Sequence, residues 1–359
     1  MGKLLLSLAL GAAALYALKR GGLPILPASH ALDNVRWWTV PGYLVLVGIS
    51  SYFRGARWRL LLRPIADVSS FRALSAVLVG SAAILLLPLR LGEMVRPYLI
   101  ARDRRISVLG AIGSVVAERI IDGLVLSSIL AVALVTVPTI VPLPAQVLGM
   151  PITVAAVRGY AWTFLVGFSV AFLASVVFHA AREASVKITR ATLGKISPRL
   201  AELVTIMLRR FSDGLDFFRH RRLALQFMFE TTLYWTCAAA AYWLLGWGTG
   251  VVHADGSSMS FGEACAIMGM LGIATALPGP PGLIGIFQAG VYAAMTMYFP
   301  SEVLAGPGSV YVFLLYVLQL AFTCVCGLVC LLLTGTGRAS ADAASASDAS
   351  GAARPNDES

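Results

Sequence analysis

Charged residues are scarce in this chain of 359 residues. Asp, Glu, Lys and Arg make up 13% of the sequence, hydrophobic residues make up 58%, and the mean hydropathy is +0.80. Because a water-soluble fold cannot hide that much apolar surface, the composition excludes a soluble globular protein. The apolar runs have helical length, and the sequence lacks the short alternating strands of a membrane barrel. We therefore expect an all-α polytopic membrane protein.

The usual motifs of metal, nucleotide and nucleophile chemistry are also missing. No CxxC pair lies near histidines or acids, so the cysteines are interpreted as small buried hydrophobic residues. All five cysteines lie inside apolar runs: Cys237, Cys265, Cys324, Cys326 and Cys330. No GxxxxGK[ST] phosphate-binding loop occurs. Transport driven by proton coupling, or downhill scrambling without an energy source, is left. We expect no catalytic residues, no metal and no cofactor.

The N-terminus lacks the form of a cleavable signal peptide. Lys3 precedes an apolar run over residues 4–18, but Lys19 and Arg20 stand where the small residues of a cleavage site belong. The run is therefore interpreted as a first transmembrane helix.

Two apolar segments are interrupted in the same way. Phe71 precedes Pro88 by seventeen residues, and Phe261 precedes Pro278 by the same number. The residues predicted to break the helices are Pro88 and Gly92 in the first segment, and Pro278, Pro281, Gly282 and Gly285 in the second. A break frees backbone N–H and C=O groups, which must be satisfied by protein or water inside a bilayer. The paired breaks predict two re-entrant hairpins around a protected polar cavity.

Basic residues are concentrated in one loop. Residues 182–222 hold ten basic side chains against four acidic ones, whereas residues 223–337 contain no Lys or Arg. The positive-inside rule therefore predicts that the loop is cytoplasmic. Its apolar residues, spaced among the charges, are typical of an amphipathic helix on the inner leaflet, and a solvated linker helix fits the same pattern.

This orientation predicts an inverted repeat. The two halves, residues about 40–142 and 223–334, each have the pattern helix, hairpin, helix, with one hairpin entering from the cytoplasm and the other from outside. A transmembrane span and the cytoplasmic loop at 182–222 join the halves in one domain, residues 1–334. Both termini are expected in the cytoplasm, where residues 335–359 form a disordered tail. Arg54 and Arg57 are placed at the cytoplasmic boundary.

Charged residues inside the apolar segments are candidate substrate-binding groups. Arg90, Glu93 and Arg96 are spaced three apart, so they share one face if this segment is helical. Arginine binds phosphate in a bidentate way, which predicts a headgroup site. An internal ion pair that holds the broken backbone explains the same spacing.

A second acidic and basic cluster precedes a long apolar span. Glu118 and Asp122 are four residues apart, and Arg119 can reach Asp122. Ionisable groups at this depth normally face the bundle interior or a wet cavity, so these residues either line the cavity or form a buried structural network. Glu230 is a lone intramembrane acid, with proton relay, pairing and snorkelling as alternatives. Gln288 adds a polar face to the second hairpin.

Three segments give the chain a family resemblance: LPLRLGEMVRPYLI at 87–100, VAERIIDGLVL at 116–126 and LPGPPGLIGIFQAG at 277–290. Together they resemble the lysylphosphatidylglycerol synthase transmembrane region, a flippase-like family that also has stand-alone members, over about residues 4–334. The resemblance implies a lipid-translocating domain that moves lipid from the inner to the outer leaflet. Its motifs correspond to Gly92, Glu93 and Arg96, to Glu118, Arg119 and Asp122, and to Pro281, Gly282 and Gly285.

Two features depart from the family pattern. An acidic residue is usual after the second glycine-rich break, where Gln288 stands here, which puts in doubt a mechanism that needs a carboxylate in this hairpin. We also expect no aminoacyl-transferase domain, and so no synthesis of lysylphosphatidylglycerol by this chain alone.

The combined hypothesis is a flippase or transporter of a polar or anionic lipid in a bacterial inner membrane. The expected partners are a membrane lipid and either a second copy of the chain or a lipid-synthesis enzyme, and no nucleic acid despite the net charge of +10. An alternative is a membrane-embedded transferase, but carboxylates beside arginines are poor bases. A further alternative is a non-transporting partner that recruits an envelope-lipid enzyme.

Overall fold

The computed structural model describes most of the chain. The described residues are 11–16, 18–20, 23–87, 92–102, 106–140, 154–193, 195, 197–213, 216, 220–276 and 279–352. Within them the backbone forms helices and one isolated β-bridge between Val252 and Ser258, with no strand. The expected all-α fold is confirmed.

The helices follow the predicted order. The first half contains α2 (Thr39–Leu62), α3 (Ser70–Leu86), α4 (Val95–Ala101) and α5 (Val108–Thr136), preceded by η1 (Ser29–Leu32). The connecting region contains α6 (Val154–Ala180), α7 (Arg182–Leu193) and α8 (Pro198–Asp213). The second half contains α9 (Arg221–Gly248), α10 (Phe261–Ala276), η4 (Pro281–Leu283), α11 (Ile286–Met295), α12 (Ser301–Ala305) and α13 (Pro307–Ala352).

Among the described residues, three stretches are long and apolar enough to cross a membrane: Val108–Thr136, Ala161–Ala180 and Pro307–Thr334. Shorter apolar helices lie in the two interrupted segments: Ser70–Leu86 in the first, and Phe261–Ala276 and Pro281–Met295 in the second. Helices α2 and α9, with 24 and 28 residues, also have sufficient length. They carry polar residues such as Arg57 and Glu230, and these lower their hydropathy.

Serine side chains fix the start of several helices. Ser69 accepts a hydrogen bond from Arg72 N at 3.3 Å before α3, and Ser107 accepts one from Gly110 N at 3.1 Å before α5. At α10, Ser260 Oγ accepts from Glu263 N at 3.2 Å, while the Glu263 carboxylate accepts from Ser260 N at 2.7 Å. This reciprocal capping satisfies backbone donors that the first turn of a helix leaves unpaired.

Both predicted interruptions are present. Helix α3 ends at Leu86 and packs against α4, which begins at Val95; α10 ends at Ala276 and packs against α11, which begins at Ile286. Neither segment is a continuous rod. Pro88, Arg90 and Pro278 lie outside the described residues.

Steric constraints explain why glycine occupies positions at the two breaks. Gly282 and Gly285 have φ of +71° and +85°, a backbone conformation that residues with a Cβ rarely adopt. The Gly282 carbonyl accepts a hydrogen bond from the Tyr316 hydroxyl at 3.0 Å, which ties the break to α13. At the first break, a Cβ on Gly92 would lie 2.2 Å from the Ala83 carbonyl carbon. Gly92 therefore lets the chain after the break lie directly on the backbone of α3.

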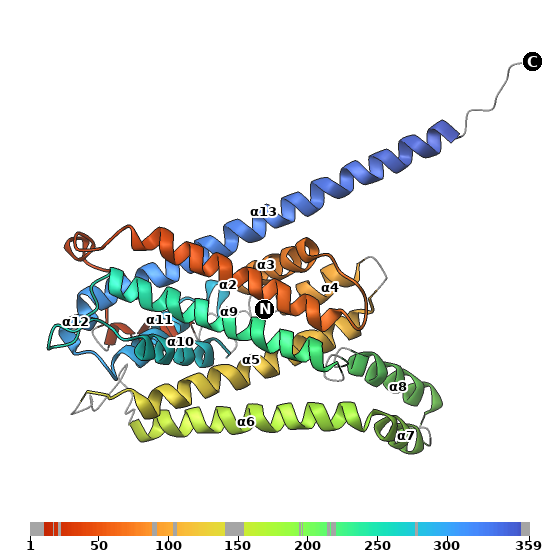
Figure 1. Cartoon of the computed structure of the whole chain (residues 1–359), viewed down its shortest axis with the longest axis horizontal. Helices are drawn as coiled ribbons and strands as arrows, with labels where there is room; N and C mark the ends of the chain where they lie inside the picture. Colours follow the sequence, from red (N-terminus) through yellow and green to blue (C-terminus); the bar gives the residue numbers. More distant parts are fainter. Residues whose placement is uncertain are drawn as a thin grey trace, which may run out of the picture.

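Packing is exchanged between the two halves. Helices α2 and α9 lie side by side and run in opposite directions (Figure 1). The first hairpin packs through α3 on α13, a helix of the second half, and the second hairpin packs through α10 on α5, a helix of the first half. Interchanging the halves maps the α3–α13 contact onto the α10–α5 contact, while the α2–α9 contact maps onto itself. The inverted repeat itself stays a prediction.

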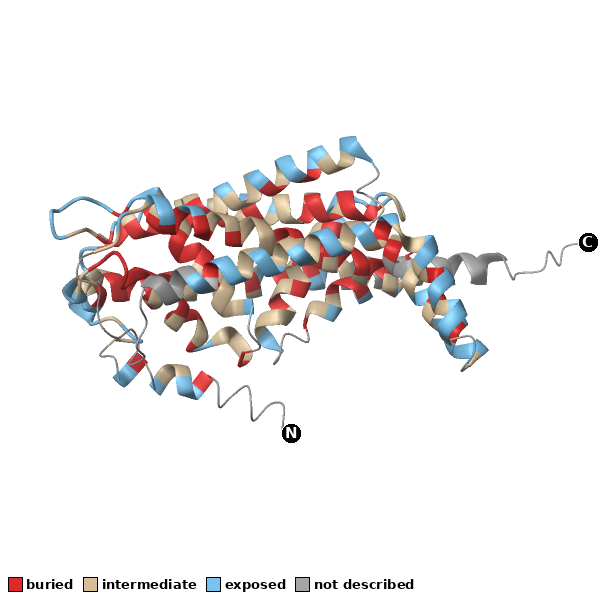
Figure 2. Cartoon of the chain, turned by 90° about the horizontal axis from the view of Figure 1, so that it is seen from below, coloured by how far each residue is buried: buried red, intermediate tan, exposed pale blue. Residues whose placement is uncertain are grey.

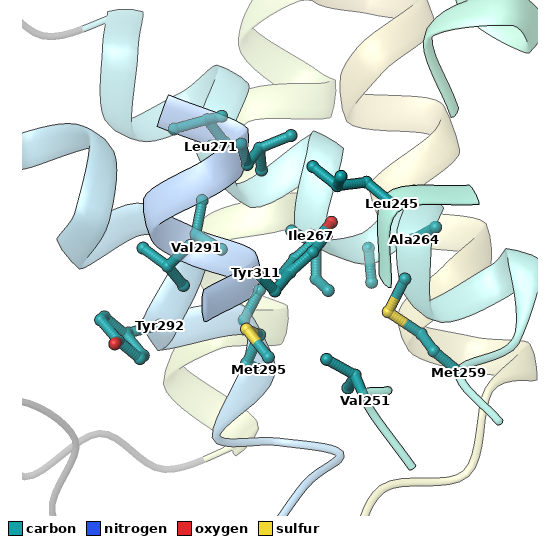
Figure 3. Close-up of a cluster of buried hydrophobic side chains, with 14 of the residues drawn as sticks. Leu245, Val251, Met259, Ala264, Ile267, Leu271, Val291, Tyr292, Met295 and Tyr311 are labelled. Carbon is teal, nitrogen blue, oxygen red and sulfur yellow. The ribbon is translucent and has the colours of Figure 1, made fainter. Parts of the chain in front are cut away.

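Each hairpin has its own hydrophobic core. One cluster packs Trp58, Val77 and Ile121 around the first hairpin. The larger cluster surrounds the second hairpin and includes Leu245 and Tyr311 (Figure 3). Buried residues follow the middle of the bundle, with exposed residues at its rim (Figure 2).

The predicted cytoplasmic loop is helical. Helices α7 and α8 pack against each other, and α8 also packs on α5. Exposed apolar residues remain on this pair, among them Ile188 and Leu203. The helical backbone of α13 extends to Ala352, into the segment expected to be a tail; residues 353–359 lie outside the described residues, and the disordered tail stays a prediction.

Replacing Gly92 by Ala tests the close approach at the first break. The added Cβ would meet backbone atoms of α3, so we expect thermal unfolding of the purified protein to report a loss of about 1–3 kcal/mol. Gly159→Ala on α6 is the matched control, because a Cβ there has no heavy atom within 4 Å. Equal stability of the two variants would contradict the packing of Gly92.

Candidate functional site

Four charged side chains form a buried network inside the first half. Arg57 on α2 donates from Nη2 to Asp122 Oδ2 at 2.7 Å and to Glu118 Oε1 at 3.2 Å, and its Nη1 donates to Asp122 Oδ1. Arg96 on α4 donates from Nη2 to Glu118 Oε2 at 2.7 Å. The side chains of Arg57 and Glu118 have no exposed surface, and that of Arg96 is 1% exposed. The network therefore joins α2, α4 and α5.

Aromatic rings and a glycine complete the enclosure of these arginines. The Arg57 guanidinium lies 4.3 Å from the ring centroid of Tyr234 on α9, and that of Arg96 lies 4.3 Å from the ring of Trp58. A Cβ on Gly80 would lie 2.3 Å from Arg96 Cγ, so the glycine makes room for the arginine stem. Stacking on aromatic faces stabilises guanidinium groups that have lost their hydration.

Two cavities lie beside this network. One has a volume of about 280 Å³ and the other about 480 Å³. The first is lined by helices of both halves, including the ends of α3 and α10 that precede the breaks. The second lies among α2, α5, α6, α9 and α10. The residues that line both cavities are Arg54, Arg119, Leu126, Tyr234, Trp235, Gly272 and Thr275.

Two arginines belong to these cavities rather than to the closed network. Arg54 donates from Nη1 to Ser81 Oγ at 3.1 Å, and its Nε lies 3.8 Å from Glu118 Oε1. Arg119 Nε lies 4.0 Å from Glu93 Oε1, beyond hydrogen-bond length. Their side chains are 19% and 31% exposed. The carboxylate oxygens of Glu118 are thus used by buried partners, while Arg54 and Arg119 reach the open space.

The predicted site residues divide between these two environments. Arg119 lines both cavities, and Glu93 and Asp122 line the second. Arg96 and Glu118 lie in the closed network, so their placement matches the internal ion pair that was the alternative to a headgroup site. Arg90 lies outside the described residues.

Glu230 and Gln288 are not among the residues that line either cavity. Glu230 Oε1 accepts a hydrogen bond from Gln226 Nε2 at 3.0 Å on the same helix. Gln288 is 4% exposed, and its Oε1 accepts from Gly285 N at 2.8 Å. The amide that replaces the usual acid therefore caps α11 and fixes the second break.

Sequence reasoning missed Arg54 and Arg57 as site residues, because the charge rule assigned both to the cytoplasmic boundary. Their i, i+3 spacing on α2 was an available signal, since it puts both side chains on one face of an otherwise apolar helix. Within the described residues, no group of three or more His, Cys, Asp or Glu side chains is arranged to hold a metal ion.

Comparison with known proteins gives one match to a family. The family model described as the lysylphosphatidylglycerol synthase TM region matches residues 4–322. No curated protein matches the chain. No solved structure matches it.

The two kinds of arginine are expected to respond differently to substitution. Arg96→Ala leaves Glu118 with a weakened set of partners in a buried site, so we expect a loss of about 3–5 kcal/mol in thermal unfolding and a lower folded yield. Arg119→Gln removes a partly exposed side chain with a distant acidic partner, and its stability should stay within about 1 kcal/mol of the wild type. The reverse order of the two losses would contradict the division into network and cavity residues.

Proposed function

The chain belongs to the family of the lysylphosphatidylglycerol synthase TM region, and on that premise we propose that it moves a polar or anionic lipid between the leaflets of the inner membrane. The membership itself points to a membrane protein of lipid handling. Translocation is our inference from the cavities.

The observation that carries this proposal is the first cavity. Its lining comes from α2, α3 and α5 of one half and from α9, α10 and α13 of the other. A polar headgroup needs a protected passage, because crossing hydrocarbon strips it of hydration. A space bounded by both halves can open toward either side when they shift against each other, as in transporters built from inverted repeats.

The second cavity supports a route for the acyl chains. Phe164 and Phe168 of α6 line it together with Leu126. The long apolar stretch of α6 is only 6% buried, so this helix has most of its surface available to lipid. A cavity walled by such a helix lies next to the hydrocarbon, where acyl chains can remain while the headgroup enters the protein.

The two breaks supply the flexible points of this proposal. Gly282 and Gly285 have positive φ, outside the helical range, and Gly92 starts a single 3-10 turn before α4. Hinges in transporters are short segments that absorb changes in φ and ψ. Rotation at these points would move the ends of α3 and α10 that line the first cavity.

Orientation follows from the basic loop, and labelling can test it. In a background without the five native cysteines, Ser257→Cys should react with an impermeant maleimide added to intact cells, and Ala184→Cys on α7 should react only after the membrane is opened. Both positions are exposed. Labelling of Ala184→Cys in intact cells would overturn a cytoplasmic α7.

A steric block tests translocation itself. Ser51 lines the first cavity, so Ser51→Trp should fill it and reduce the flipping of fluorescent phosphatidylglycerol in reconstituted vesicles to the level of protein-free vesicles. Ala184→Trp adds the same ring to the exposed surface of α7 and should leave flipping unchanged. Full flipping by correctly folded Ser51→Trp protein would contradict a path through this cavity.

A further inference from the structure

The wall shared by the two cavities holds buried hydrogen-bond donors that lack acceptors. The Nε atoms of Arg54 and Arg119 are both buried without a hydrogen-bond partner among the described residues. The indole N–H of Trp235, which lines both cavities, likewise has no acceptor there. Arginine and tryptophan side chains can only donate, so an acceptor must come from elsewhere.

The charges at this place do not balance. The described ion pairs join four arginines (Arg54, Arg57, Arg96 and Arg119) with three acids (Glu93, Glu118 and Asp122), which leaves an excess of one positive charge. Arg57 and Arg96 take the short contacts of Glu118 and Asp122, so the excess resides on the cavity arginines. An excess cation on these partly exposed side chains attracts an anionic ligand.

The shape of the surroundings restricts the anion further. Apolar side chains, including Leu126, Ile273 and Phe168, line the second cavity together with the arginines. A ligand that satisfies both parts carries an anionic group with several acceptor oxygens at one end and hydrocarbon at the other. Phosphate oxygens match the planar fork of donors that each guanidinium presents.

We propose that Arg54 and Arg119, with the N–H of Trp235, which lines the same two cavities, bind the phosphate group of an anionic phospholipid, and that Arg54 is the binding residue that sequence reasoning missed. This proposal rests on the proposed function, because it names the substrate class of the same cavity. The Ser81 hydroxyl accepts a hydrogen bond from Arg54 Nη1, and this contact orients the rest of the guanidinium for the phosphate. The closed network beneath it keeps Glu118 from neutralising Arg54 fully.

Lipid binding to the full chain in detergent tests the assignment. Native mass spectrometry with phosphatidylglycerol as the probe should show about tenfold weaker binding for Arg54→Gln and for Arg119→Gln, since each variant loses charged hydrogen bonds. Arg54→Lys keeps the positive charge but loses the planar set of guanidinium N–H donors, so its lipid affinity should lie between those of Arg54→Gln and the wild type. Arg63→Gln is the control, because Arg63 is exposed and lines neither cavity.

Further probes identify the ligand chemistry. Diacylglycerol with the same chains should bind weakly and equally to wild type and Arg54→Gln, and millimolar inorganic phosphate should not displace the lipid. Displacement by inorganic phosphate, or equal lipid affinity of the folded Arg54→Gln and wild-type proteins, would overturn the proposal.

A flipping assay on the same proteins separates this site from the proposed function. If the lipid affinities change as expected but the wild type flips no lipid in vesicles, the phosphate site stands and translocation fails. If the wild type flips lipid and Arg54→Gln binds it with unchanged affinity, translocation stands and the phosphate site fails.

Discussion

The fold depends on the pairing of buried charge. Arg57, Arg96, Glu118 and Asp122 are buried, and unpaired they would cost several kcal/mol each. Because their hydrogen bonds run between α2, α4 and α5, the first hairpin can keep its position only when all three helices are in place. Gly80 and Trp58 complete this arrangement by giving room and an aromatic face to Arg96. The broken segment thus gains a rigid attachment that its interrupted backbone could not provide.

The closed network also explains why positive charge stays available at the cavities. Glu118 could neutralise Arg54, yet its two oxygens accept the shorter bonds of Arg57 and Arg96. Arg54 and Arg119 consequently keep their charge directed toward the space between the halves. In our proposal, structural and binding roles are divided among neighbouring residues of the same type: two arginines hold the helices, and two stay available. The internal ion pairs and the proposed headgroup site then coexist, the first on Arg57 and Arg96 and the second on Arg54 and Arg119.

The sequence predicted the architecture better than the site. Composition, the matched spacing of Phe71 and Phe261 before their breaks, and the charge of residues 182–222 were sufficient for an all-helical membrane bundle with two interrupted segments, because each reflects local chemistry. The site depends on distances between helices, which no local pattern contains. The spacing of Arg96 from Glu93 left a headgroup site and an internal ion pair open, and only the fold shows that Arg96 shares Glu118 with Arg57 of α2. Gln288 was expected to contact substrate, whereas the geometry of Gly285 makes it a cap.

The exchanged packing has a consequence for how such a chain could arise. Helix α3 rests on α13 and α10 rests on α5, so either half made alone would lose one of the surfaces on which its hairpin packs. In the inverted repeat that the sequence predicts, a second copy in the opposite orientation would supply that surface. If the halves are the inverted repeat that the sequence predicts, this exchange is what a dimer of oppositely oriented protomers would show after fusion into one polypeptide, with α6, α7 and α8 as the linker.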